Sequence, residues 1–268
     1  MSRGGPAMLA GALLVGLALA AALLSLVWTP YDIAAIDVAA RLQPISAAHP
    51  LGTDQLGRDM LSMLMAGGRV SLAVSLLAVG AAMLVGVPIG LAAAAFGGWV
   101  DEGAMRGADV LFAFPSLLLA ILLAAILGPG AFNAILAIAL FNIPVFARVA
   151  RGAALGLWQR DFVAAARLAG KGRGAISVGH VLPNILAAIG VQATIQFSLA
   201  LIAEAGLSYV GLGVQPPAAS WGRMLGDAQT LIGAAPRLAV LPGLAILLVV
   251  LGFTLLGDGL RDRLDMRA

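Results

Sequence analysis

Several apolar stretches of about 20 residues follow one another along this chain, and each is long enough to cross a bilayer as an α-helix. Inside a bilayer every backbone N–H and C=O group must find its partner within the protein, which restricts spanning segments to helices and closed barrels. Charged residues make up only 11% of the 268 residues, against about 25% in an ordinary soluble domain. The sequence therefore predicts an all-α, polytopic membrane protein.

Hydropathy and turn residues divide the chain into six expected transmembrane helices. The first is expected to be retained, because its apolar run exceeds the length of a signal-peptide core, with Trp28 and Tyr31 as interfacial anchors. The Gly-Pro-Gly sequence at 128–130 predicts a turn, and Pro115 is expected to interrupt the third span. In chain order, the expected spans are 7–28, 70–96, 109–127, 131–150, 185–203 and 238–256.

Two features concern the second span and the polar segment before it. Gly86 and Gly90 are four residues apart, a spacing that lets two membrane helices approach closely. The polar segment 29–68 contains Asp54, Arg58 and Asp59, which we expect to form a local salt-bridged cap rather than to contact a substrate.

Lysine and arginine residues are distributed unevenly between the two sides of this topology. Six spans place both termini on one side together with the loops 97–106 and 151–182, and that side holds eleven of them against five. The positive-inside rule makes it the cytoplasmic side, whereas a five-span arrangement would split the two basic clusters across the membrane. The cytoplasmic set is Arg3, Arg106, Arg148, Arg151, Arg160, Arg167, Lys171, Arg173, Arg261, Arg263 and Arg267, and the outer set is Arg41, Arg58, Arg69, Arg223 and Arg237.

The segment 161–184 is a basic and largely polar interruption between the fourth and fifth spans. Its first half, 162–168, is alanine-rich and predicts a short helix. Gly170 is expected to end this helix, because glycine readily accepts the positive φ angle of a C-terminal cap. A short exposed helix between membrane spans, followed by a glycine turn, is suited to docking a partner.

The sequence offers little support for an enzyme. Its only lysine, Lys171, is followed by Gly172, which excludes a Gly-x4-Gly-Lys-Ser/Thr phosphate-binding loop. The sequence also lacks a His-Glu-x-x-His metal motif and a Gly-x-Ser-x-Gly nucleophile motif. The chain has no cysteine, and we expect its two histidines, His49 and His180, to be loop residues rather than metal ligands. We therefore expect no metal or cofactor on this chain, and energy supplied by a partner.

A family resemblance is carried by the sequence Phe-Val-Ala-Ala-Ala-Arg-Leu-Ala-Gly at 162–170 and by His-Val-Leu-Pro-Asn at 180–184. Together they resemble the cytoplasmic EAA loop of ABC-importer permeases, whose pattern is Glu-Ala-Ala-x3-Gly-x9-Ile-x-Leu-Pro. This chain departs from the pattern at Ala164, in place of the glutamate, and at His180, in place of the isoleucine. Four further stretches, 49–59, 204–217, 220–222 and 256–265, resemble the "C" subunits of the dipeptide, oligopeptide and nickel permeases.

The resemblance implies the type I ABC-importer permease fold, in which a short helix sits in a groove of a cytoplasmic ATPase. Closure of the ATPase dimer on ATP then shifts the membrane helices between inward-facing and outward-facing packings. Ala165 and Ala166 would allow close approach to the ATPase, and Gly170 would provide the turn. The residues assigned to this coupling loop are Phe162, Ala164, Ala165, Ala166, Arg167, Gly170, His180, Leu182 and Pro183.

The same resemblance implies a second homologous permease, two ATPase subunits or domains and a periplasmic substrate-binding protein as partners. ATP and Mg would be bound by the ATPase subunits, and the complex would lie in the bacterial inner membrane. The chain is accordingly expected to divide into an N-terminal helix with a periplasmic segment (1–69), a permease domain (70–258) and a cytoplasmic tail (259–268).

Two groups of polar residues, one in the fifth span and one in the segment that follows it, have two interpretations each. Those in the fifth span could line the translocation pathway, or could make interhelical hydrogen bonds worth about 0.6 kcal/mol each. Glu204, Ser208 and Trp221 could form a periplasmic gate or contact the binding protein, whereas Glu204 could equally be an interfacial carboxylate without a further role. The candidate pathway residues are Gln192, Thr194, Gln196 and Ser198.

The expected function is therefore that of a permease subunit that imports di- or oligopeptides. Nickel or another small solute is the first alternative within the same family. A stand-alone channel or proton-coupled carrier would require Asp, Glu or His relays inside the spans, and a membrane-embedded enzyme would require a paired nucleophile and base. The sequence favours neither.

Overall fold

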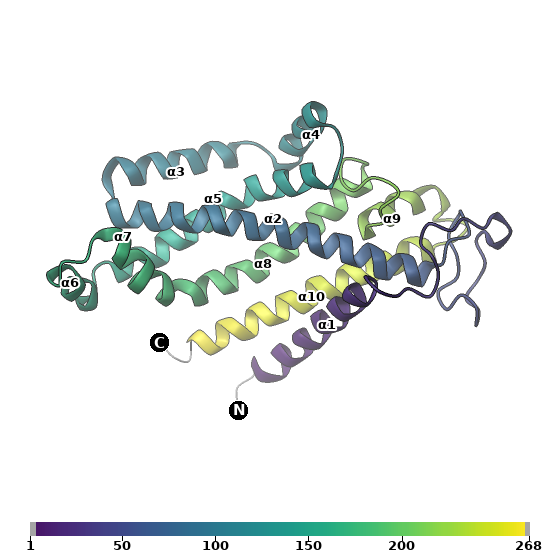
Figure 1. Ribbon diagram of the computed structural model, residues 1–268, viewed down its shortest axis with the longest axis horizontal. Helices are drawn as coiled ribbons and strands as arrows, with labels where there is room; N and C mark the ends of the chain where they lie inside the picture. Colours follow the sequence, from purple (N-terminus) through teal and green to yellow (C-terminus); the bar gives the residue numbers. More distant parts are fainter. Residues whose placement is uncertain (1–3, 266–268) are drawn as a thin grey trace.

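The computed structural model describes residues 4–265, so Arg3 and Arg267 of the charge count lie outside the described residues. Helices dominate this part of the chain, and no β-strand occurs within it (Figure 1). The long helices are α1 (Gly4–Leu24), α2 (Met60–Phe96), α3 (Gly98–Ala113), α5 (Ala131–Leu157), α8 (Leu182–Tyr209) and α10 (Arg237–Asp265). The shorter elements are α4 (Ser116–Leu127), α6 (Asp161–Leu168), α7 (Arg173–Ile176) and α9 (Trp221–Ala228), with 3-10 turns at Val38–Ala40 and Gln229–Leu231 and a π-turn at Ser177–Val181.

Five helical segments are long and apolar enough to cross a membrane, namely α1, α2, α5, α10 and the continuous run from α7 through α8. Helices α3 and α4 meet the same criterion as a pair, and they are bent by 85° relative to each other. Proline explains the break, because Pro115 lacks an N–H group and disfavours helical backbone at Phe114. The predicted six spans with an interrupted third are therefore confirmed when this broken pair counts as one crossing.

Several helix bounds differ from those expected. Helix α2 begins at Met60 rather than at 70, because the Asp59 carboxylate caps it by accepting a hydrogen bond from the Ser62 N–H group at 2.8 Å. Helix α3 occupies most of 97–106, a segment that the sequence predicts to be a loop, and it follows a turn in which Gly97 and Gly98 have positive φ angles. The expected divisions at 69/70 and 258/259 fall inside α2 and α10, and the three-part division of the chain stays a prediction.

Helix α8 also extends further at its C-terminus than expected. The apolar run ends at Ala203, but the helix continues to Tyr209 because Glu204 is buried inside the protein rather than placed at the membrane surface. Helix α9 is an additional element in the segment that follows. Ser220 caps α9 by accepting a hydrogen bond from the Arg223 N–H group at 3.1 Å.

Helices α2 and α5 pack directly against each other through two glycines. A Cβ atom at Gly86 would lie 2.8 Å from the Cβ atom of Phe146, and one at Gly90 would lie 2.9 Å from the Cβ atom of Ala150. Such distances leave no room for a side chain, so the predicted close-packing face is confirmed. This contact lies within a buried apolar cluster to which α8 also contributes, with Ile185 as one of its members.

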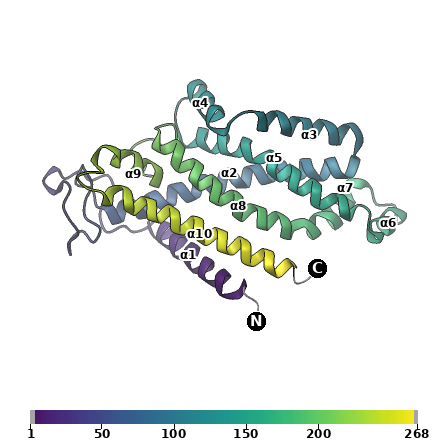
Figure 2. The same ribbon diagram turned by 180° about the vertical axis from the view of Figure 1, so that it is seen from behind.

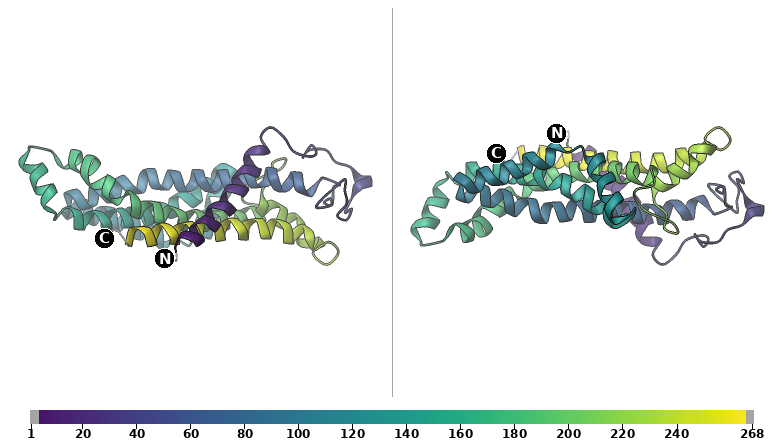
Figure 3. Two further views of the ribbon diagram at one scale, coloured as in Figure 1. Left: turned by 90° about the horizontal axis from the view of Figure 1, so that it is seen from below. Right: turned by 90° about the horizontal axis from the view of Figure 1, so that it is seen from above.

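The bundle is elongated, with α2, α5 and α8 in its middle, α1 and α10 side by side along one flank, and α3 on the other flank (Figures 1 and 2). Its two ends carry different elements (Figure 3). One end carries α6 and α7 near the turn between α2 and α3, and the opposite end carries the 29–59 segment and α9. The first turn of α1 and the last turn of α10 face the α6 end, as a six-span topology requires.

Polar contacts hold the 29–59 segment against the ends of α2 and α10 that lie opposite α6. The Arg237 guanidinium donates hydrogen bonds to the carbonyl groups of Leu42 and Gln43, at 2.9 and 2.7 Å. The expected local cap is present as an Asp54–Arg58 ion pair with an Oδ2–Nε distance of 2.6 Å. Asp59 has other partners than the expected Arg58. It caps α2, and its Oδ1 atom lies 3.0 Å from the Nδ1 atom of His49.

Candidate functional site

Helix α6 stands at one end of the bundle and presents two different faces. Val163 and Ala166, three residues apart, are 0% and 7% exposed and pack inward in the same cluster as Ile176 of α7. The Ala166 side chain is thus buried within its own chain, and its assignment to the coupling loop stays a prediction. Among the residues assigned to the coupling loop on this helix, the exposed ones are Phe162, Ala164, Ala165 and Arg167.

Leu168 is the most exposed large apolar residue of the described chain, at 90%. It follows Phe162 and Ala165 at intervals of three residues, so these three side chains lie along one side of α6, which we call the α6 face. Sequence reasoning placed Leu168 in the predicted helix but did not single it out. The sequence could have drawn attention to Leu168, because it is an apolar residue at the end of a short helix in a polar loop, at a position where the motif does not require one.

The turn after α6 is fixed by backbone hydrogen bonds around Gly170. The Gly170 N–H group donates to the Arg167 carbonyl at 2.9 Å, and the Lys171 N–H group donates to the Ala166 carbonyl at 3.1 Å. This is the hydrogen-bond pattern of a Schellman motif, and it requires the positive φ angle of 78° that Gly170 adopts. The predicted glycine turn is confirmed.

The return from this turn into α8 is held by the second half of the motif. The Lys171 Nζ atom lies 2.8 Å from the Nε2 atom of His180, which ties the ends of the loop together. Pro183 cannot donate a backbone hydrogen bond, and a π-turn at Ser177–Val181 precedes it, in which the Leu182 N–H group bonds to the Ser177 carbonyl. The predicted residues His180, Leu182 and Pro183 thus form the junction between the α6 end and α8.

Cations are concentrated at the α6 end of the molecule. The Arg167 guanidinium lies 5.1 Å from the centre of the Trp158 ring, and that of Arg173 lies 5.6 Å from the centre of the Phe96 ring. Arg160 and Lys171 are exposed at the two ends of α6. The α6 end is basic overall, but Asp161, seven residues before Leu168, adds an exposed carboxylate on the side of α6 that carries Leu168.

The candidate pathway residues on α8 do not gather at one place. Gln196 is 3% exposed and donates a hydrogen bond to the Asn142 Oδ1 atom on α5, while Asn142 donates to the Ile138 carbonyl at 2.7 Å. Ser198 is 7% exposed and donates to the Thr194 carbonyl at 3.2 Å. Gln192 and Thr194 are half-buried. For Gln196 the geometry supports the interhelical hydrogen bond, and a pathway role for the four residues stays a prediction.

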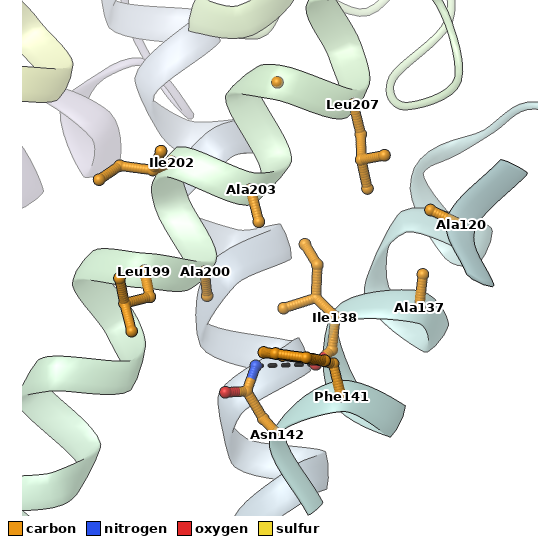
Figure 4. Close-up of a pocket in the computed structure, with 11 residues that line it drawn as sticks. Ala120, Ala137, Ile138, Phe141, Asn142, Leu199, Ala200, Ile202, Ala203 and Leu207 are labelled. Atoms are coloured by element: carbon orange, nitrogen blue, oxygen red, sulfur yellow. Dashed lines mark hydrogen bonds between the residues drawn. The ribbon is translucent and has the colours of Figure 1, made fainter. Parts of the chain in front are cut away.

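A cavity of about 330 Å³ lies beside this hydrogen bond, between α4, α5 and α8 (Figure 4). Its lining is mostly apolar and combines small residues, such as Ala120 of α4, with large ones, such as Phe141 of α5 and Leu207 of α8. Asn142 is the polar side chain of the lining, and in Figure 4 it lies at the edge of the cavity below Ile138 and Phe141. The cavity therefore suits uncharged groups, with one amide within reach.

The Asn142–Gln196 contact can be measured with a double-mutant cycle. We expect Asn142→Leu and Gln196→Leu together to destabilise the purified complex less than the sum of the two single changes, by about 0.6 kcal/mol. Thermal unfolding in detergent gives the coupling, and the pair Asn142→Leu with Gln192→Leu serves as the control that should be additive. Additive effects in the first cycle would show that the two amides do not support each other.

The outer candidates Glu204, Ser208 and Trp221 are 0%, 1% and 5% exposed. Ser208 donates a hydrogen bond from its hydroxyl group to the Glu204 Oε1 atom at 2.7 Å. The Trp221 indole N–H group donates to the Leu64 carbonyl of α2 at 2.9 Å. Glu204 is thus no interfacial carboxylate, and in this conformation none of the three side chains is open to direct contact with a binding protein. A gating role stays a prediction.

Residues 86–268 match the protein family described as "Binding-protein-dependent transport system inner membrane component". The chain is 46% identical over 225 residues to the "Dipeptide transport system permease protein DppC" of Alkalihalophilus pseudofirmus, covering 84% of this chain and 74% of that protein. It is 46% identical over 220 residues to the "Glutathione transport system permease protein GsiD" of Pectobacterium atrosepticum, covering 82% and 73%. Its fold matches a chain of the MetNI methionine ABC transporter in inward facing conformations, with a TM-score of 0.62, 20% identity, and coverage of 74% of this chain and 94% of that chain.

Proposed function

The chain belongs to the family of binding-protein-dependent transport system inner membrane components, and from this membership we propose that it imports short peptides as one of two permeases in an ATP-driven complex. The two relatives are named for dipeptide and glutathione transport, and both cargoes are short peptides. A peptide cargo is therefore preferred to nickel or another small solute.

The observation that carries the coupling to an ATPase is the α6 face. Leu168 is 90% exposed, yet α6 itself is fixed by two buried residues and by the Gly170 turn. A rigid helix with an exposed apolar projection is suited to transmit force to the helices that follow it. The ATPase is inferred to present an apolar groove, and ATP and Mg are bound on the ATPase rather than on this chain.

The basic α6 end is assigned to the cytoplasm by the positive-inside rule. Both termini then lie on the cytoplasmic side, and the 29–59 segment and α9 lie on the periplasmic side, where a substrate-binding protein delivers the cargo. Alternating access follows if ATP binding to the ATPase pair favours one of two packings of the membrane helices. The cavity between α4, α5 and α8 is the part of this chain best placed to face the cargo or the second permease.

The proposal is tested by reconstituting the complete complex in liposomes and measuring uptake of a labelled dipeptide, glutathione and nickel. We expect uptake of the dipeptide or of glutathione, dependent on ATP and on the binding protein, and its loss when the ATPase subunits are omitted. Uptake by this chain with no ATPase present would identify a stand-alone carrier. Uptake of nickel alone would replace the peptide assignment by the first alternative of the same family.

A further inference from the structure

Glu204 is a buried carboxyl group inside a membrane-spanning helix, and the proposed transport mechanism does not use it. It is 0% exposed and lies on α8, near the end of the bundle opposite α6. Its Oε1 atom accepts a hydrogen bond from Ser208, whereas its Oε2 atom has no hydrogen-bond partner of normal geometry among the described residues. Carboxyl groups in membrane spans are costly to bury and are retained where they have a role.

Three buried hydroxyl groups from different elements surround this carboxyl group. Ser208 belongs to α8, Ser71 to α2, and Ser220 precedes α9, and the side chains of Ser71 and Ser220 lie beside Glu204 as well. Each hydroxyl oxygen already accepts a hydrogen bond from a backbone N–H group, which leaves its own proton free to be donated. Ser208 donates its proton to the Glu204 Oε1 atom, and the Oε2 atom is the free acceptor beside the other two hydroxyl groups.

The backbone groups held by the three serines all belong to the outer cap, by which we mean residues 210–228. Ser208 accepts from the Val214 N–H group, Ser71 from that of Trp221, and Ser220 from that of Arg223, each at 3.1 Å. The cluster thus connects the cap, through Glu204, to both α8 and α2. Removing the carboxyl group would leave several buried hydroxyl protons without an acceptor.

Steric contacts show that the outer cap is closely docked on the same two helices. A Cβ atom at Gly222 of α9 would lie 2.5 Å from the Cα atom of Ala205 on α8. A Cβ atom at Gly68 of α2 would lie 2.7 Å from the Trp221 ring. Packed contacts of this kind resist sliding, so the cap and the two helices are expected to move together.

Helix α8 connects this cluster with the α6 end of the molecule. The helical run from Arg173 to Tyr209 is continuous, and Glu204 lies near its outer end. We infer that Glu204 is a positioning residue that fastens the outer cap to α8 and α2, so that a displacement of α8 at the α6 end carries the cap with it. This inference rests on the proposed coupling at α6, and it assigns no contact with cargo to Glu204.

The inference is tested in the complete complex with Glu204→Ala and Glu204→Gln. Glutamine keeps the Oε1 acceptor and offers an amide that can donate to the neighbouring hydroxyl oxygens, so it is the conservative variant. We expect Glu204→Ala to lower ATP-dependent uptake about tenfold, as for the loss of a buried hydrogen-bonded junction, and Glu204→Gln to keep at least about half of the uptake. Ser208→Ala removes two hydrogen bonds, one to Glu204 and one from the Val214 N–H group, but it keeps the carboxyl group, so it should give a smaller decrease.

Movement of the cap is measured separately with spin labels, which is straightforward because the chain has no cysteine. Labels at Leu77→Cys on α2 and Ala218→Cys in the outer cap, both exposed positions, should give a narrow distance distribution in the parent and in Glu204→Gln. The distribution should broaden in Glu204→Ala and, to a lesser degree, in Ser208→Ala. If Glu204→Ala does not assemble, the Ser208→Ala variant provides the test. Unchanged distances and uptake in both alanine variants, or equal loss in Glu204→Gln and Glu204→Ala, would overturn the inference. Absence of ATP-dependent uptake in the parent complex would instead contradict the proposed function.

Discussion

Replacing Leu168 by aspartate is expected to lower ATP-dependent uptake by about a hundredfold while leaving the fold of this chain intact. The Leu168 side chain is 90% exposed, so it contributes little packing within its own chain. In the assembled complex the same side chain is expected to fill an apolar groove of the ATPase, where its loss and the burial of a charge both weaken binding. A factor of one hundred corresponds to about 2.8 kcal/mol, which is within the range of a central interface residue.

Electrostatics acts in the same direction for this variant. A charge buried in an apolar groove without a partner is strongly unfavourable, so the aspartate does more than remove the leucine contact. Leu168→Ala removes the apolar contact without adding a charge, so it should reduce uptake less than Leu168→Asp. A decrease in Leu168→Ala, which adds no charge, would show that the apolar contact of the leucine itself is needed.

Val38→Asp provides the matched control. Val38 is 73% exposed but lies in the 29–59 segment at the opposite end of the bundle, so the same charge there should leave ATPase coupling unchanged. The measurements are ATP-dependent uptake in liposomes and retention of the ATPase subunits during purification. If Leu168→Asp retained both at the level of Val38→Asp, the α6 face would not be the docking surface.

Features set by one or two residues could be predicted from the sequence. Pro115 breaks a span because a proline removes a hydrogen bond wherever it occurs, and Gly170 adopts a positive φ angle that its position after a short helix requires. The spacing of Gly86 and Gly90 indicates a close helix contact for the same local reason. Such residues act through backbone geometry, so their effect does not depend on knowing the partner helix.

Features set by residues far apart in the sequence could not be predicted. Glu204 interrupts an apolar run and therefore indicates a surface position, until burial beside Ser71 and Ser220 shows that the helix continues through it. The two faces of α6 are a similar case, because Ala165 and Ala166 are identical in the motif and only packing against α7 buries one of them. In both cases tertiary burial overrides local polarity.

Gly90→Val is expected to prevent α2 and α5 from packing, and to lower the melting temperature of the complex by roughly 5–10 °C or to abolish its assembly. A Cβ atom at this position would lie 2.9 Å from both the Ala150 Cβ atom and the Arg151 backbone nitrogen, so the clash involves backbone that no rotamer change can relieve. Membrane helices associate through close packing rather than a hydrophobic driving force, so a forced separation cannot be offset by burying the new side chain. Arg151 also forms an ion pair with Asp101 of α3, which would shift with it.

Gly80→Val on the same helix distinguishes this clash from a general effect of valine in α2. A Cβ atom at Gly80 would meet no described atom within 4 Å, so this variant should assemble and melt like the parent. Melting is followed by fluorescence in detergent, and assembly by co-purification of the partner subunits. Equal stability of Gly90→Val and Gly80→Val would mean that α2 and α5 are not in close contact at Gly90. The centre of the bundle would then have to be packed differently.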